Sequence, residues 1–126
     1  MPVYNGAMFI RQALDSALAQ TFTDFELIIS DNASNDDTQL ICEEYCNKHP
    51  QIIYVRHKKN LGAHWNFNFV TQNAKGDFIT WLAHDDILEP TFLAETVRYM
   101  FQKPSTVLVA SDFMIIDQNG TNLGAE

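Results

Sequence analysis

Short apolar segments alternate with longer amphipathic ones along this chain, and this alternation constrains the fold more than any other feature. Nearly continuous apolar runs suited to strands lie at Phe25–Ser30, Ile52–Arg56 and Phe78–Leu82. Such runs are typical of strands that are covered on both faces of a sheet. Segments with helical periodicity lie between and around them, at Ala7–Gln20, Asp36–His49, His64–Ala74 and Pro90–Gln102. The pattern predicts an α/β fold, a Rossmann-like βαβ sandwich with a mainly parallel sheet.

Individual residues refine the predicted helices. Ile10, Leu14, Ala17 and Leu18 share one face of the first helix, and Pro50 ends the second. Pro90 suits the first turn of the last helix. In that last helix the residues expected to face inward are Leu93, Val97, Met100 and Phe101. Two more strands are expected at Val107–Ser111 and Phe113–Ile116.

Length and charge limit the classes of function. The 126 residues correspond to a single domain, and no run of about 18 apolar residues suggests a membrane span. The net charge of −8 is opposite to that of a surface that binds nucleic acid phosphates. The segment Met1–Gly6 lacks the features of a signal peptide. We therefore expect a cytoplasmic protein, held at the inner face of a membrane if an anchor lies on sequence outside this chain.

Polar residues follow three of the predicted strands. They are Pro2-Val3-Tyr4-Asn5, the segment from Asp31 to Thr38, and His84-Asp85-Asp86. Parallel topology brings the carboxyl ends of strands to one edge of the sheet, where ligands bind in open α/β folds. Carboxylates there suit Mg²⁺ or Mn²⁺ carrying a diphosphate. The alternative for the third segment is a solvated acidic turn before a helix.

Two cysteines allow a different metal hypothesis. Cys42 and Cys46 lie four residues apart on a predicted helix, with His49 close behind. A structural zinc site needs a fourth ligand, and no suitably spaced candidate is found. Two helix-face thiols in a reducing compartment are the favoured interpretation.

Taken together, these motifs resemble the nucleotide-sugar-binding half of the family 2 inverting glycosyltransferases. The resemblance lies in Pro-Val-Tyr-Asn, the stretch Ala19–Thr38, Asn60-Leu61-Gly62 and the stretch Ala74–Asp86. It implies a GT-A fold and transfer of a sugar from a UDP-, GDP- or dTDP-linked donor to a saccharide or lipid-linked acceptor, as in polysaccharide biosynthesis. The acidic net charge separately argues against a nucleic-acid partner.

The resemblance assigns roles to individual residues. Pro2, Val3 and Tyr4 would flank the base, and Asn5 completes this nucleotide-binding segment. Asp31 would bind a uracil-like edge or the ribose. Asp85 and Asp86 would form the acidic metal motif for Mg²⁺ or Mn²⁺, one touching ribose or sugar and the other the metal.

The chain departs from the family pattern in several places. Ala83 stands where the commoner Asp-x-Asp motif has its first acid, and Phe67 stands where many members have Arg before the Asn equivalent to Asn68. The catalytic base is expected on sequence downstream of this chain, together with the acceptor-binding part. The first strand is expected to be cut short at its start. We therefore expect donor binding without sugar transfer, and self-association through uncovered surface.

Two other functions are compatible with parts of the sequence. One is a non-catalytic module that binds a nucleotide or a sugar. The other is a phospho-acceptor signalling domain, which also combines βα alternation with clustered aspartates. In that class the acidic pair should follow the first strand, whereas here it follows a later one.

Overall fold

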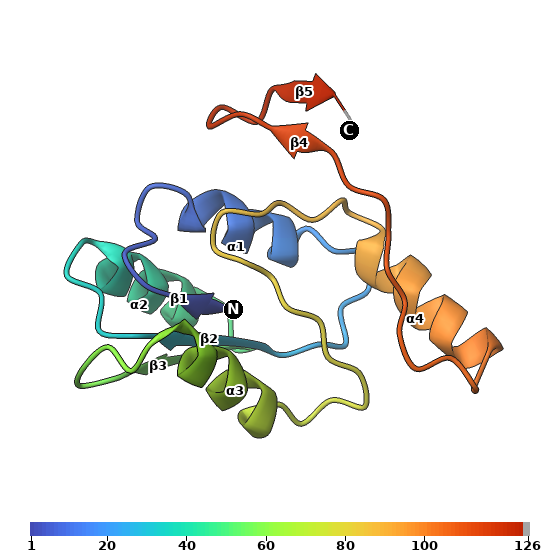
Figure 1. Ribbon diagram of the computed structural model, residues 1–126, viewed down its shortest axis with the longest axis horizontal. Helices are drawn as coiled ribbons and strands as arrows, with labels where there is room; N and C mark the ends of the chain where they lie inside the picture. The colour runs from blue at the N-terminus through green and yellow to red at the C-terminus, as the bar shows by residue number, and fades with distance from the viewer. Residues whose placement is uncertain (125–126) are drawn as a thin grey trace.

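A three-stranded parallel sheet organises the structure. The computed structural model describes residues 1–124. The strands β1 (Pro2–Val3), β2 (Leu27–Asp31) and β3 (Ile52–Arg56) lie in the order β1-β2-β3. Val3 pairs with Asp31, and Asp31 pairs with Arg56. The three strands therefore end level with one another, and the loops that follow them share one edge (Figure 1).

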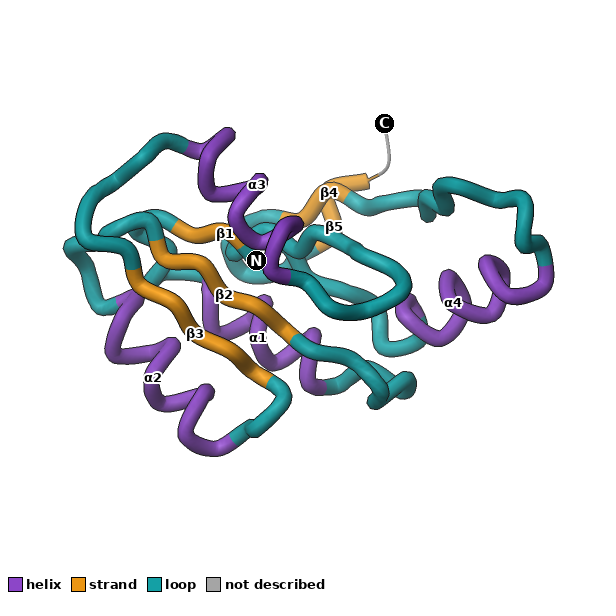
Figure 2. The backbone as a smooth tube through the Cα atoms, turned by 90° about the horizontal axis from the view of Figure 1, so that it is seen from below, coloured by secondary structure: helices purple, strands orange, loops and turns teal. Residues whose placement is uncertain are grey.

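Helices cover both faces of this sheet. The helices α1 (Ile10–Leu18) and α2 (Thr38–Lys48) lie on one face, and α3 (Ala63–Asn73) lies on the other (Figure 2). The predicted apolar face of α1 is confirmed, because Ile10, Leu14 and Ala17 are buried and Leu18 packs against the core. The parallel α/β architecture expected from the sequence is likewise confirmed.

The expected strand at Phe78–Leu82 is wrong. These residues form no strand, and of the five only Leu82 is buried, whereas Trp81 is 55% exposed. A strand needs a neighbour with free backbone groups along its length. β1 would be that neighbour, but its ladder with β2 has only two residue pairs. The segment therefore runs as an irregular chain, with Leu82 as its anchor in the core.

The C-terminal third also differs from expectation. The helix α4 (Phe92–Gln102) forms as predicted, yet none of its residues is buried, and Phe101 is 69% exposed. The expected inward position of Phe101 is therefore wrong, whereas Leu93, Val97 and Met100 are half-buried. Val107–Ser111 is not a strand, and β4 covers only Ile115–Ile116, paired antiparallel with β5 (Asn122–Gly124). Within residues 1–124 there is no helix both long and apolar enough to cross a membrane.

Candidate functional site

Hydrogen bonds join the loops that follow β1 and β2. The backbone N–H of Asn5 donates to the Ser34 hydroxyl oxygen (2.8 Å), and the N–H of Asn35 donates to Asn5 Oδ1 (2.9 Å). One residue further on, the N–H of Gly6 donates to Thr38 Oγ1 (2.9 Å) at the start of α2. Residues far apart in sequence thus form one continuous surface at the carboxyl end of the sheet.

The Asp31 carboxylate lies beneath this surface. Its side chain is 0% exposed and accepts hydrogen bonds from the Ser34 N–H (2.8 Å) and the Tyr54 hydroxyl (2.7 Å). The Arg56 guanidinium lies 3.6 Å from Oδ2. Burial and the hydrogen bond to Asp31 raise the pKa of Tyr54 far above its ordinary value, so that its hydroxyl remains a donor. The hydrogen bonds and the ion pair that reach this carboxylate thus come from a backbone amide, a tyrosine hydroxyl and an arginine.

A turn after β3 is attached to the same edge. The side chain of Asn32 donates to Asn60 Oδ1 (2.9 Å) and accepts from the N–H of Leu61 (2.9 Å). Gly62 ends this turn with φ of +87°, a conformation that favours glycine. The Asn-Leu-Gly motif thus fixes the loop that leads into α3 against the end of β2.

The sequence reasoning missed a buried polar residue that ties the sheet to α3. Asn66 is 2% exposed and donates from Nδ2 to the carbonyl of Ser30 (2.9 Å). Its Oδ1 accepts from the Ser30 hydroxyl, whose oxygen also lies 2.7 Å from His57 Nε2. Because the Ser30 proton goes to Asn66, His57 is the donor in that second bond. A single Asn in a helix carries no sequence signal that distinguishes it from a surface Asn.

The segment His84-Asp85-Asp86, called the acidic segment below, lies at the same edge although no strand precedes it. A Cβ added to Gly6 would lie 2.6 Å from His84 Cδ2, so the His84 ring is in direct contact with the turn after β1. Leu82 and Leu88 pack in the core on either side of the segment. The Leu88 N–H also donates to Ser16 Oγ on α1 (3.1 Å). The carboxylate side chains of Asp85 and Asp86 are exposed.

The carboxylates of Asp85 and Asp86 suit a cation whose remaining ligands are waters and substrate phosphates. Across residues 1–124, no group of three or more His, Cys, Asp or Glu side chains could enclose a metal ion. Mg²⁺ commonly binds through one or two carboxylates, and waters and substrate phosphates complete its coordination. Two exposed carboxylates at one end of the site match that donor set.

The predicted site residues thus fall into two groups. Tyr4, Asn5, Asp85 and Asp86 are exposed at this edge, whereas Pro2, Val3 and Asp31 are buried.

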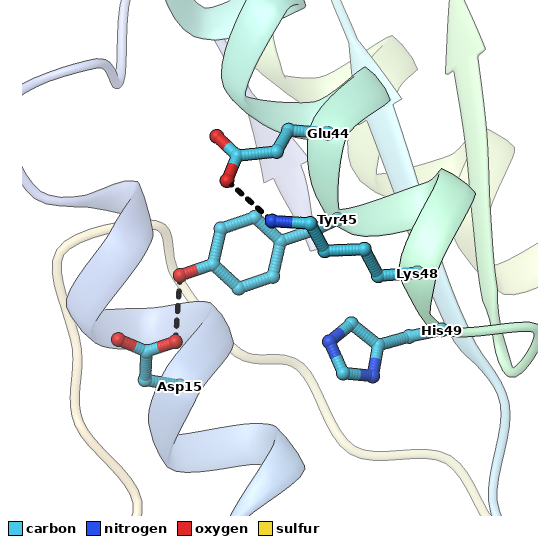
Figure 3. Close-up of a pocket in the computed structure, with 5 residues that line it drawn as sticks. All are labelled: Asp15, Glu44, Tyr45, Lys48 and His49. Atoms are coloured by element: carbon cyan, nitrogen blue, oxygen red, sulfur yellow. Dashed lines mark hydrogen bonds and ion pairs between the residues drawn. The ribbon is translucent and has the colours of Figure 1, made fainter.

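A separate groove between α1 and α2 is lined by Asp15, Glu44, Tyr45, Lys48 and His49 (Figure 3). None of these lining residues belongs to a loop that follows a strand, so this groove is distinct from the candidate site.

Comparison with known proteins identifies the class. Residues 1–124 match the Glycosyl transferase family 2 domain, and the chain belongs to this family. A protein of Rickettsia typhi described as an uncharacterized glycosyltransferase is 36% identical over 124 residues, which cover 98% of this chain and 38% of that protein. An uncharacterized protein of Mycobacterium tuberculosis is 35% identical over 121 residues, covering 93% of this chain and 35% of that protein. The chain thus spans well under half the length of these relatives.

Solved structures show the same fold. TarS from S. aureus in complex with UDP-GlcNAc matches with a TM-score of 0.77 at 22% identity, over 91% of this chain and 38% of that one. The mannosyltransferase PcManGT from Pyrobaculum calidifontis, in complex with GDP-Man and Mn²⁺, matches with a TM-score of 0.74 at 21% identity, over 92% and 34%. The GT-A fold and the family expected from the sequence are confirmed. The family match also decides against the phospho-acceptor alternative.

Proposed function

We propose that residues 1–126 form the donor-binding domain of a glycosyltransferase. The enzyme transfers a sugar, with inversion, from a nucleoside-diphosphate sugar to an acceptor hydroxyl on a saccharide or a lipid-linked carrier. Membership of family 2 supports the reaction class. The UDP-GlcNAc and GDP-Man complexes of the two structural neighbours support the donor class.

The observation that carries this proposal is the meeting of three loops at one edge of the sheet. The Asn5–Ser34 hydrogen bond joins the first two loops, and the contact between Gly6 and His84 joins the third. The exposed residues Tyr4 and Asn5 are at the nucleoside end, above the buried Asp31. Asp85 and Asp86 are at the diphosphate end.

In this proposal Asp86 holds Mg²⁺ or Mn²⁺, and Asp85 shares the metal or contacts the ribose. The bound cation supplies Lewis-acid stabilisation of the negative charge that develops on the diphosphate leaving group. With a net charge of −8, the chain itself would repel a bare diphosphate. The Mn²⁺ in the PcManGT complex supports this choice of metal.

The acceptor hydroxyl must lose a proton to a general base. We propose that this base, together with the acceptor pocket, is contributed by sequence outside residues 1–126. The support is that the chain matches only 38% of the length of the Rickettsia typhi relative. Residues 1–126 alone then bind the donor but transfer no sugar, because a positioned and deprotonated acceptor is missing.

Calorimetry with UDP, GDP and dTDP tests the proposal, each with and without Mn²⁺. We expect one nucleotide to bind, and Mn²⁺ to raise its affinity. Asp86→Ala should remove the effect of Mn²⁺, and Asp85→Ala should reduce it. Asp24→Ala is the matched control, since Asp24 is also exposed but precedes β2 at the opposite edge of the sheet. Equal affinity in the wild type and both site variants would refute the metal role, and sugar transfer by residues 1–126 would place the base within them.

A further inference from the structure

One buried serine connects all the elements that form the nucleoside end of the candidate site. Ser34 is 2% exposed, and each of its three polar groups bonds to a different segment. Its N–H donates to Asp31 on β2, and its carbonyl accepts from Arg56 Nη2 on β3 (2.8 Å). Its hydroxyl oxygen accepts from the N–H of Asn5 (2.8 Å), in the loop after β1. Ser34 thus links both neighbouring strands to that loop.

The loop residue that Ser34 holds has an uncommon backbone conformation. Asn5 has φ of +53°, in the left-handed region that non-glycine residues seldom occupy. Such a conformation persists only where surrounding groups hold it. Two bonds hold Asn5, one from its N–H to Ser34 Oγ and one from the N–H of Asn35 to its Oδ1. The direction of the adjacent Tyr4 side chain, which is 45% exposed, follows from this turn.

The opposite side of Ser34 is bonded to the central sheet. The Asp31 carboxylate that accepts from its N–H is fully buried and is also bonded to the Tyr54 hydroxyl (2.7 Å). Asp31, Tyr54 and Arg56 all belong to strands of the central sheet. A buried carboxylate with several donors cannot shift without leaving one of them unpaired. The hydroxyl of Ser34 therefore transmits the position of the sheet to the Tyr4–Asn5 turn.

We propose that Ser34 is a positioning residue for the nucleoside, acting through its hydroxyl to hold the Tyr4–Asn5 turn in the orientation that receives the base. This inference rests on the proposed function, because it needs a nucleotide at this edge of the sheet. In this proposal Ser34 does not contact the nucleotide itself. The segment that carries Asp85 and Asp86 is anchored in the core by Leu82 and Leu88, so the effect of Ser34 should fall mainly on the nucleoside end.

The first test is the substitution Ser34→Ala, which removes the hydroxyl but keeps the backbone hydrogen bonds to Asp31 and Arg56. Calorimetry with UDP, or with GDP or dTDP if the wild type prefers it, is done with and without Mn²⁺. We expect nucleotide affinity to fall about fivefold to tenfold, corresponding to one lost hydrogen bond. The factor by which Mn²⁺ raises affinity should stay unchanged. Ser34→Thr retains a hydroxyl and should keep more of the nucleotide affinity than Ser34→Ala; its melting temperature is measured beside it, because the added methyl group enters a buried position.

Tyr45→Phe is the control for loss of a hydrogen bond elsewhere, because the Tyr45 hydroxyl donates to Asp15 (2.6 Å) between α1 and α2 (Figure 3). It should bind nucleotide as the wild type does. Affinity of Ser34→Ala equal to wild type would overturn the inference while leaving the proposed function standing. A parallel fall in affinity, Mn²⁺ factor and melting temperature would show a merely structural role and overturn it as well. A wild type that binds none of the three nucleotides would instead refute the proposed function.

Discussion

Gly6 is the point at which the acidic segment contacts the turn after β1, and Gly6→Ala tests that contact directly. An added Cβ would lie 2.6 Å from His84 Cδ2 and 2.7 Å from Val3 Cγ2, distances that real Cβ contacts do not reach. Val3 is 2% exposed and enclosed by the core, so the half-buried His84 must yield. Overpacking of this kind costs about 1–3 kcal/mol of unfolding free energy. For a chain of this size each kcal/mol lowers the melting temperature by roughly 3–5 °C.

The displaced His84 should carry Asp85 and Asp86 with it, so Gly6→Ala should also weaken the Mn²⁺-dependent part of nucleotide binding. Urea unfolding and calorimetry measure the two effects. Gly76→Ala is the milder control, since its added Cβ would lie 3.2 Å from the Phe78 carbonyl oxygen and 4.0 Å from the Phe78 backbone nitrogen, away from the candidate site. Adding His84→Ala to Gly6→Ala should restore part of the lost stability. A Gly6→Ala variant with unchanged stability and unchanged binding would refute the reasoning.

Two further predictions concern the polar network and the pH dependence of stability. Tyr54→Phe removes a donor from the buried Asp31 carboxylate and should lower the free energy of unfolding by about 1–3 kcal/mol, measured by urea titration; no loss would mean that this bond is dispensable. The ion pairs with Lys48 and Arg11 lower the pKa of Glu44 from 4.5 to about 2. Because the pKa is depressed in the folded state, the stabilisation is fully present above the unfolded value and is lost as pH falls from about 4.5 towards 2. Glu44→Gln should flatten the stability profile in that pH window, and an unchanged profile would contradict the assignment.

Local pattern was sufficient for the elements that form the sheet and its covering helices. The strand Ile52–Arg56 has the predicted bounds, and β2 differs from the predicted Phe25–Ser30 by starting two residues later and ending one later. These two predicted strands form because each pairs with a parallel neighbour of adequate length. Phe78–Leu82 has an equally apolar pattern but no such neighbour. Only Leu82 of this segment is buried, so apolar composition alone placed it neither in the core nor in the sheet. A strand requires a ladder partner, which a local pattern does not reveal.

The buried polar residues were the least predictable part of the site. Ser34, Thr38 and Asn66 are each at most 2% exposed, and each bonds to residues about 30 or more positions away in the sequence. Their burial depends on loops that meet only after folding, so no periodicity marks them. Asp31 was predicted as a site residue, but its bonds to Tyr54 and Ser34 could not be inferred from spacing.

The two ends of the candidate site are held by different kinds of interaction, and this difference suits their proposed ligands. The nucleoside end rests on buried, directional hydrogen bonds centred on Ser34, which fix positions closely. Discriminating one base from another needs such fixed geometry. The diphosphate end rests on apolar anchors at Leu82 and Leu88, with exposed carboxylates between them. A hydrated cation tolerates variable carboxylate geometry when waters and phosphates complete its coordination. The fold thus fixes most closely the nucleoside end, where base discrimination needs fixed positions, and holds the segment of Asp85 and Asp86 through a few packed side chains.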